Sequence, residues 1–209
     1  MRSKSTLNHL FVTIFVCDYS KFAFVYGHAS PSDIPQLLDR FYADTSLLQE
    51  KHGPIRCVRR DNASVNVSAA VMEWLLKRQI RSETSNPYEP WQNGTAERIL
   101  QTLFATARTV LVSSGLDGRF WYLAMQYATR IHNIQFSASL ASTPYVLMHG
   151  CKPDVSGDRQ FGVEAWLYVQ PERRQDPKFG RRGEPCILLD TPCMSNATLF
   201  GVTLVESTQ

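Results

Sequence analysis

The segment HLFVTIFVCDYSKFAFVY, residues 9–26, decides the fold class. Its first half, residues 9–17, is a nearly continuous run of β-branched, aromatic and other apolar residues, which is typical of a strand buried on both faces. Residues 18–21 supply turn-forming side chains, and residues 22–26 are apolar again. The segment predicts two strands joined by a turn rather than a membrane span, because Asp18, Ser20 and Lys21 interrupt it.

Helical and strand patterns alternate after this hairpin. Apolar spacing and capping residues predict helices over residues 32–51, 69–79, 93–114, 119–133 and 144–149. Short strands are predicted at 55–60 and 80–83, and a loop rich in proline and turn formers at 84–92. This order predicts an α/β fold in which helices flank one mixed sheet.

The sequence pattern changes after Gly150. Short strand patterns at 164–170, 185–189 and 198–205 are separated by basic and Gly/Pro-rich segments. They predict a small all-β unit that is reached through a linker at 151–160. The chain is therefore predicted to hold two domains, residues 1–150 and 160–209.

The composition sets broad limits on function. The 209 residues are 44% hydrophobic and 20% charged, with a net charge of +3, which permits a nucleic-acid partner without establishing one. The five cysteines form no CxxC pair, so a zinc site is disfavoured and reduced, mostly buried thiols are expected. Residues 1–8 are polar and resemble no signal peptide, so we expect an intracellular protein, nuclear or cytoplasmic, with no membrane partner.

Two acidic residues stand where chemistry is common in α/β folds. Asp61 follows the strand at 55–60, and Glu97 lies in the first turn of the helix at 93–114. Carboxylates at a strand end and at a helix start can converge on Mg²⁺, which prefers oxygen ligands. The alternatives are structural: Asp61 as an Asx-turn residue, and Glu97 as a residue that favours the positive end of a helix dipole.

The sequence around these residues resembles the integrase region of copia-type (Pseudoviridae-like) retrotransposon polyproteins. The resemblance rests on residues 59–62 (RRDN) and 86–98 (NPYEPWQNGTAER). Further matches run from Ser114 through the Thr143-Pro144-Tyr145 block to Ile187–Asp190. The resemblance therefore covers nearly the whole chain.

This resemblance implies a ribonuclease-H-like core followed by a small β-barrel. In the family two aspartates and a glutamate bind Mg²⁺ or Mn²⁺, so Asp61 would be the second ligand and Glu97 the third. The first aspartate of the family would precede Met1, so the core is expected to be N-terminally truncated and to lack its first strand and first ligand. Asp18 is the tempting substitute, but it is better explained as a turn residue.

The resemblance also implies contacts with DNA. Tyr88, Gln92, Asn93 and Gly94 would lie on the loop that approaches the DNA ends, and Arg98 and Arg108 would reach phosphates from the helix. The tail holds a basic cluster made of Arg173, Arg174, Lys178, Arg181 and Arg182. Such clusters supply salt-dependent binding that ignores sequence. Trp74, Trp121 and Trp166 are expected to be core aromatic residues.

The implied ancestral function is DNA integration, in which the element ends are joined to target DNA by metal-dependent strand transfer. With one ligand missing, and with Arg60, Ala63 and Trp91 departing from the family pattern, little or no strand transfer is expected from this chain alone. Two alternatives remain, a non-catalytic nucleic-acid-binding remnant and a non-functional pseudogene product. A homo-oligomer is also left open.

Overall fold

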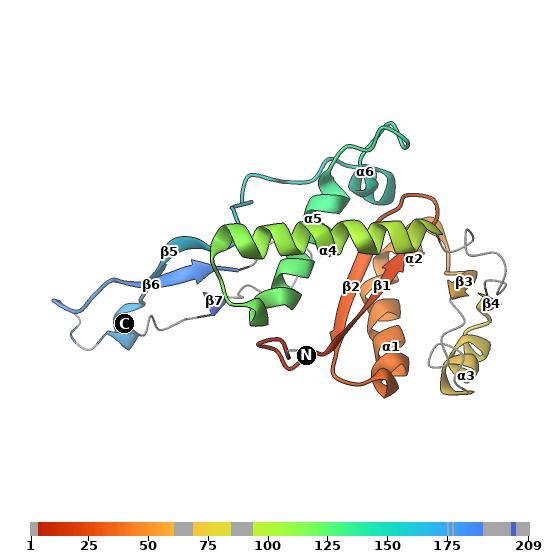
Figure 1. The fold of residues 1–209 in the computed structure, drawn as a ribbon, viewed down its shortest axis with the longest axis horizontal. Coiled ribbons are helices and arrows are strands. Elements are labelled where there is room, and N and C mark those ends of the chain that lie inside the picture. Colours follow the sequence, from red (N-terminus) through yellow and green to blue (C-terminus); the bar gives the residue numbers. More distant parts are fainter. Residues whose placement is uncertain are drawn as a thin grey trace.

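The structure, a computed structural model, describes residues 4–60, 69–84, 94–174, 176, 178–189 and 202–203. Helices and short strands form a body, from one end of which a strand pair projects (Figure 1). The fold is mixed α/β, as the order of sequence patterns predicts. No helix in the described ranges is long and apolar enough to cross a membrane.

The hairpin predicted from residues 9–26 is confirmed. β1 (Phe11–Val16) pairs antiparallel with β2 (Ala23–His28). Val12 and Ile14 pack against one hydrophobic cluster, whereas Phe15 packs against the other. Since successive side chains of a strand point to opposite faces, β1 contacts apolar neighbours on both sides, which explains its continuous apolar sequence.

The helices fall close to the predicted ranges. In chain order they are η1 (Pro31–Asp33), α1 (Ile34–Asp44), α2 (Ser46–His52), α3 (Ala69–Lys77), α4 (Gly94–Ser114), η3 (Gly118–Phe120), α5 (Trp121–Ile134), α6 (Pro144–His149) and η4 (Pro171–Arg173). The single helix predicted over 32–51 is wrong in two details. Ser30, not Ser32, caps the entry into η1, and Thr45 separates α1 from α2. Thr45 Oγ1 donates to Phe41 O at 2.8 Å, a side-chain bond that competes with regular helix geometry.

A second strand pair lies beside the first. β3 (Cys57–Arg60) pairs parallel with β4 (Arg81–Thr84), and α3 connects them. The sequence predicted one mixed sheet, but in the described ranges the β1–β2 and β3–β4 pairs form separate sheets. Among the described residues no strand is hydrogen-bonded to both pairs, and α1 and α2 separate β2 from β3 along the chain.

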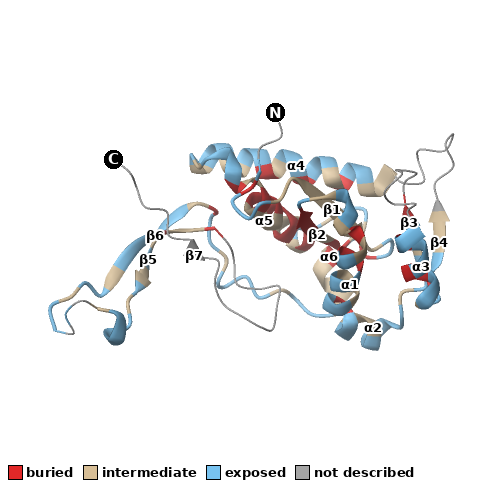
Figure 2. Ribbon diagram, turned by 90° about the horizontal axis from the view of Figure 1, so that it is seen from below, coloured by how far each residue is buried: buried red, intermediate tan, exposed pale blue. Residues whose placement is uncertain are grey.

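The C-terminal strands form an antiparallel sheet in the order β5 (Val163–Tyr168), β6 (Gly183–Leu188) and β7 (Val202–Thr203). Phe161 and Leu189, at the base of this sheet, are buried in the same cluster as α4 and α5. Figure 2 shows buried residues gathered along α4, α5 and β2, whereas β5 and β6 are mostly intermediate or exposed. Only the base of the small sheet therefore shares the core of the body.

The thiols differ from the expectation of mostly buried cysteines. Cys186 is buried and Cys17 is half-buried, but Cys57 and Cys151 are exposed. Among the described cysteines all four are free. The expectation rested on the usual burial of cysteine, and it did not foresee that Cys57 lies on the thinly covered strand β3 and that Cys151 begins an exposed linker.

Candidate functional site

Helix α4 positions Glu97. Ile99, Leu103 and Ala107 are buried, and Leu100 and Val110 pack against the same cluster, so the predicted apolar stripe of this helix is confirmed. This packing leaves Glu97, in the first turn, with an exposed side chain. Within the described ranges no hydrogen bond or ion pair engages the Glu97 carboxylate.

The first turn of α4 lies near the ends of several strands. Both ribbon views place it near the carboxyl end of β1 and near the β3–β4 pair (Figures 1 and 2). A helix start therefore meets strand ends, which is the arrangement that places ligand-binding side chains in many α/β proteins.

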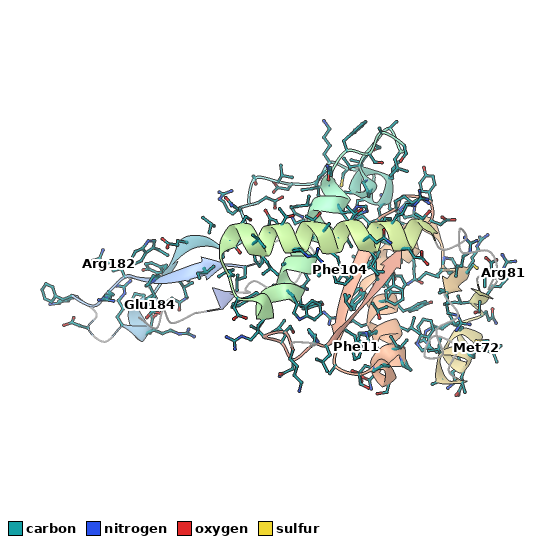
Figure 3. All side chains as sticks on the ribbon, viewed as in Figure 1. Phe11, Met72, Arg81, Phe104, Arg182 and Glu184 are labelled. Atoms are coloured by element: carbon teal, nitrogen blue, oxygen red, sulfur yellow. The ribbon has the colours of Figure 1, made fainter. Side chains whose placement is uncertain are left out.

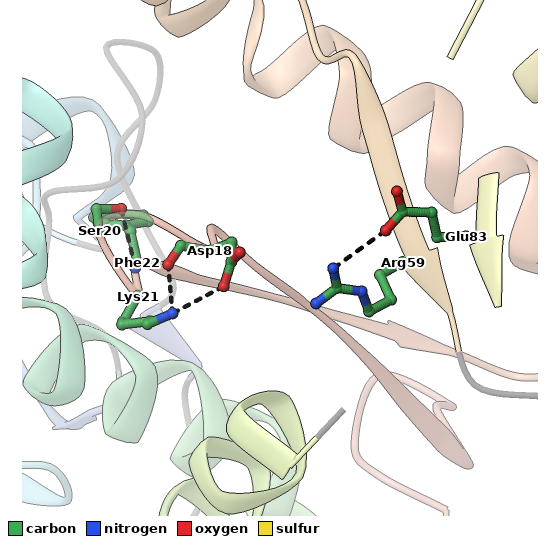
Figure 4. Close-up of polar contacts among 6 residues, drawn as sticks. All are labelled: Asp18, Ser20, Lys21, Phe22, Arg59 and Glu83. Carbon is green, nitrogen blue, oxygen red and sulfur yellow. Dashed lines mark hydrogen bonds and ion pairs between the residues drawn. The ribbon is translucent and has the colours of Figure 1, made fainter. Parts of the chain in front are cut away.

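Asp18 lies in the turn that follows β1. Its carboxylate pairs with Lys21 Nζ at 2.9 Å, and the same ammonium group also contacts Asp18 O (Figure 4). The hydrogen bond and charge of Lys21, with a smaller contribution from Arg59, lower the pKa of Asp18 below its usual value. Asp18 is thus a turn residue whose charge is already balanced by a lysine.

Arginines fix the end of β3, directly before Asp61. Arg60 is buried, and its Nε and Nη2 donate to Ser82 Oγ at 3.0 and 2.6 Å. Arg59 Nη2 lies 3.2 Å from Glu83 Oε2 on β4 (Figure 4). The hydrogen bond from Arg59, followed by that of Cys57, lowers the pKa of Glu83. Asp61 itself lies outside the described residues, as do Tyr88, Gln92 and Asn93.

The remaining predicted DNA contacts lie on α4. Gly94 is its first residue, and Arg98 is exposed and donates from Nε to Gly94 O at 2.9 Å. Arg108 lies almost three turns beyond Arg98, because an α-helix completes one turn in about 3.6 residues. The structure brings Gly94 and Arg98 next to Glu97, and leaves Arg108 apart from them.

Arg108 borders an apolar pocket of about 440 Å³ between α4 and α5. The pocket is lined by Phe104, Ala107, Arg108, Leu111, Val112, Leu116, Gly118, Trp121 and Met125. Arg108 itself is exposed, and its predicted contact with phosphates stays a prediction. The spacing of apolar residues predicted helix α4, but it could not predict which side chains from other elements lie beside Arg108.

The donors for a metal ion are sparse in the described part. Among those residues no group of three or more His, Cys, Asp and Glu side chains could hold an ion. Glu97 nevertheless fits one ligand position, since it is an exposed carboxylate free of described partners. Mg²⁺ in phosphate chemistry is commonly held by one or two carboxylates together with water and substrate oxygens.

One surface was missed from the sequence. The prediction that Trp166 is a core residue is wrong, because its side chain is 75% exposed. Tyr168, two residues further along β5, is 64% exposed. The available signal was the alternation of β5, which places positions 164, 166 and 168 on one face. By contrast, Trp74 is buried and Trp121 packs on the core, as predicted.

Comparison with solved structures defines the class of fold. The chain superposes on the cryo-EM structure of the simian T-cell lymphotropic virus intasome in complex with PP2A regulatory subunit B56 gamma with a TM-score of 0.57. The match covers 90% of this chain and 65% of that chain, at 18% sequence identity. At this identity the similarity concerns the fold alone, which is that of a chain in a retroviral intasome.

Comparison of sequences gives the more particular relationship. The chain is 29% identical over 184 residues to the retrovirus-related Pol polyprotein from transposon TNT 1-94 of Nicotiana tabacum. The match covers 87% of this chain and only 13% of the polyprotein, so the chain spans a small part of that relative. No model of a known protein family matches. The chain is therefore similar in sequence to part of a retrotransposon Pol polyprotein and in fold to a chain of a retroviral intasome.

Proposed function

We propose that the chain is the integrase part of a copia-type retrotransposon polyprotein, with a ribonuclease-H-like core over residues 1–150 and a β-barrel-like unit over 160–209. Its ancestral role is the joining of element ends to target DNA. The observation that carries the proposal is the position of Glu97, an unengaged carboxylate at a helix start beside two strand ends. The integrase-like fold and the polyprotein relative support it.

The proposed reaction is a phosphoryl transfer. A DNA 3′-hydroxyl attacks a target phosphodiester, so one P–O bond forms while another breaks and releases a new 3′-hydroxyl; the proton of the attacking group leaves to water. Asp61 and Glu97 would hold Mg²⁺ or Mn²⁺, which when bound neutralises charge on the reacting phosphate. Gly94 and Arg98, together with Tyr88, Gln92 and Asn93, would position the DNA ends, and Arg108 would be a more distant phosphate contact.

We further propose that this chain alone performs little strand transfer. In the family three acidic side chains hold the metal, and only Asp61 and Glu97 match positions here. Asp18 is the candidate to replace the first aspartate of the family. It is paired with Lys21, so its use as a metal ligand would require breaking that ion pair.

The test separates metal-assisted DNA binding from joining. Anisotropy with a labelled duplex that has recessed ends should show affinity rising about threefold or more when Mn²⁺ is added. Glu97→Gln and Asp61→Asn should each remove this rise, because each deletes a negative ligand. Glu73→Gln is the matched control, since Glu73 is an exposed acid on α3 that pairs with Lys77. Persistence of the Mn²⁺ effect in Glu97→Gln would contradict the metal role.

A joining assay with a plasmid target completes the test. We expect few or no joined products from the wild-type chain in Mg²⁺ or Mn²⁺. Robust joining would overturn the proposal of an incomplete catalyst while keeping the integrase assignment.

A second function is favoured by the tail. Its five basic residues form no ion pair with a described acidic residue, and four of them, all except Arg174, have no described side-chain partner and can meet phosphates. A non-catalytic nucleic-acid-binding protein would bind DNA with an affinity that falls steeply with salt. It would show no effect of Asp61→Asn or Glu97→Gln in either assay.

A further inference from the structure

The strand pair β5–β6 projects from the body (Figures 1 and 2). It carries exposed aromatic residues. Trp166 and Tyr168 of β5 lie on the same face, because they are two residues apart on one strand. Phe179, in the connection between the strands, is 91% exposed. Three large rings in one small hairpin are unusual on a protein surface that is not used for binding.

The opposite strand keeps this face open. Gly183 lies directly across from Tyr168, and Pro185 directly across from Trp166. A Cβ atom added to Gly183 would lie 3.4 Å from Cε3 of Trp166, so the indole extends over the glycine. A small residue at this place leaves the ring faces of Trp166 and Tyr168 uncovered by their neighbours on β6.

One arginine contacts a ring, and further cationic side chains are exposed in the same hairpin and its connection. Arg174 lies over the Tyr168 ring at 5.4 Å from its centroid, and its Nη2 donates to Tyr168 Oη at 2.9 Å. The side chains of Arg173, Lys178, Arg181 and Arg182 are exposed. Figure 3 labels Arg182 in this hairpin together with Glu184. Four of the five cations therefore have no described partner, and the fifth is held against a ring.

The hairpin and its connection also carry four exposed acidic residues, Glu164, Glu172, Asp176 and Glu184. Asp176 Oδ1 accepts from the backbone N–H groups of Lys178 at 2.7 Å and Phe179 at 3.0 Å, and these bonds lower its pKa. This carboxylate shapes the turn that presents Phe179. Glu164 shares the face of Trp166, whereas Glu184, opposite Leu167, points to the other face.

We propose that the β5–β6 face, with Trp166 and Tyr168 as stacking surfaces and the tail arginines as phosphate contacts, binds unpaired nucleotides of a nucleic acid. Rings two residues apart on a strand are separated by about 6.6 Å, roughly twice the spacing of stacked bases. Only bases outside a duplex expose ring faces that can stack on such side chains. The inference rests on the nucleic-acid partner of the proposed function and not on metal or joining.

The experiment measures anisotropy of labelled oligonucleotides with the full chain and no metal. The probes are a single-stranded DNA, a single-stranded RNA of the same sequence, and the blunt DNA duplex. We expect a single-stranded probe to bind about fivefold or more tightly than the duplex. Tighter binding of the DNA strand assigns the site to DNA ends, and tighter binding of the RNA strand assigns it to RNA.

Variants then identify the surface. Trp166→Ala and Tyr168→Ala should each weaken single-strand binding about tenfold, while duplex binding changes less than about twofold. Trp166→Phe and Tyr168→Phe should retain most of the affinity, because they keep a ring. Phe136→Ala is the matched control, since Phe136 is an exposed aromatic residue outside the hairpin.

Three results would overturn the inference. They are equal affinity for single strands and duplex, an alanine variant that binds single strands like the wild type, and binding to anionic lipid vesicles that depends on Trp166 without any preference for single strands. The assay contains no metal, so it does not depend on the proposed metal ligands, and Glu73→Gln on α3 should leave it unchanged. Failure here is therefore distinguishable from failure of the proposed integrase role.

Discussion

Asn133, on α5, takes the place of a neighbouring strand for β2. It is 1% exposed, its Oδ1 accepts from Ala23 N at 2.8 Å, and its Nδ2 donates to Ala23 O at 2.9 Å. Both backbone groups of one residue are thus satisfied by one amide in the buried interior. No apolar residue and no carboxylate can make both bonds, so the identity of this side chain is fixed by hydrogen bonding.

We predict that Asn133→Ala lowers the free energy of unfolding by about 2–4 kcal/mol, because two buried backbone groups lose their partners. Urea denaturation followed by circular dichroism measures this. Gln101→Ala, at an exposed position of α4, should change stability by less than about 0.5 kcal/mol. A loss equal to that of Gln101→Ala would show that water or repacking satisfies Ala23.

At the scale of elements, side chains of α2 form hydrogen bonds with the carboxyl end of α6. His149 stacks on Tyr145 with ring centroids 4.3 Å apart and meets Phe22 edge-on at 5.4 Å. Lys51 Nζ donates to His149 O, and the His52 ring bonds Met148 O at 2.8 Å. Cationic groups at the carboxyl end of a helix are favourable. The same surroundings disfavour charge on His149: burial first, then Lys51 and His52, lower its pKa below 6.5.

This lowered pKa predicts an acid-sensitive contact. The unfolded chain takes up a proton at His149 near pH 6.5, whereas the folded chain does so only at lower pH. The unfolding free energy is therefore fully retained above that value and decreases as the pH falls toward the folded pKa.

The prediction is measured by thermal melts from about pH 7.5 to about pH 5.5. His149→Phe keeps the ring contacts and should reduce the loss of stability in this range. His9 has a pKa lowered chiefly by burial, so a residual slope is expected. An unchanged slope in His149→Phe would exclude His149 as a source.

At the scale of the molecule, the segment between the body and the small sheet is anchored. Arg130 of α5 is 5% exposed; its Nη2 lies 2.6 Å from Asp158 Oδ1 and donates to Asp154 O at 3.0 Å. Phe161 follows directly and is buried with α4 and α5. A linker was predicted at 151–160, and part of this linker binds the body while β5 and β6 project beyond it.

We predict that Asp158→Ala lowers the unfolding free energy by about 2 kcal/mol, since it leaves the Arg130 charge buried without its partner. Limited proteolysis should cut the 151–160 segment faster. Arg130→Met combined with Asp158→Ala should recover part of the loss, because no buried charge remains. A double variant less stable than Asp158→Ala would contradict this account.

The sequence by itself determined the order and type of nearly all described elements. Apolar spacing and caps are local, so the hairpin of residues 9–26, helix α4 and the Thr143 cap of α6 follow from residues close together in the chain. The motif resemblance likewise indicated a retrotransposon polyprotein, with which the sequence comparison agrees, because both depend on the order of residues along the chain. Asp61 and the loop at 85–93 lie outside the described residues, so their roles stay predictions.

Only the tertiary structure decided which surfaces are covered. Trp166 was assigned to the core because tryptophan is usually buried, yet the hairpin that carries it projects from the body and leaves this residue 75% exposed. Asn133 with Ala23, and Lys21 with Asp18, are equally invisible in the sequence, the first pair because it joins distant segments and the second because a turn must bring it together. Local sequence patterns specify which side chains share a face of a helix or strand. Whether that face is buried, and which partners its side chains have, depends on the distant segments of the chain that pack against it.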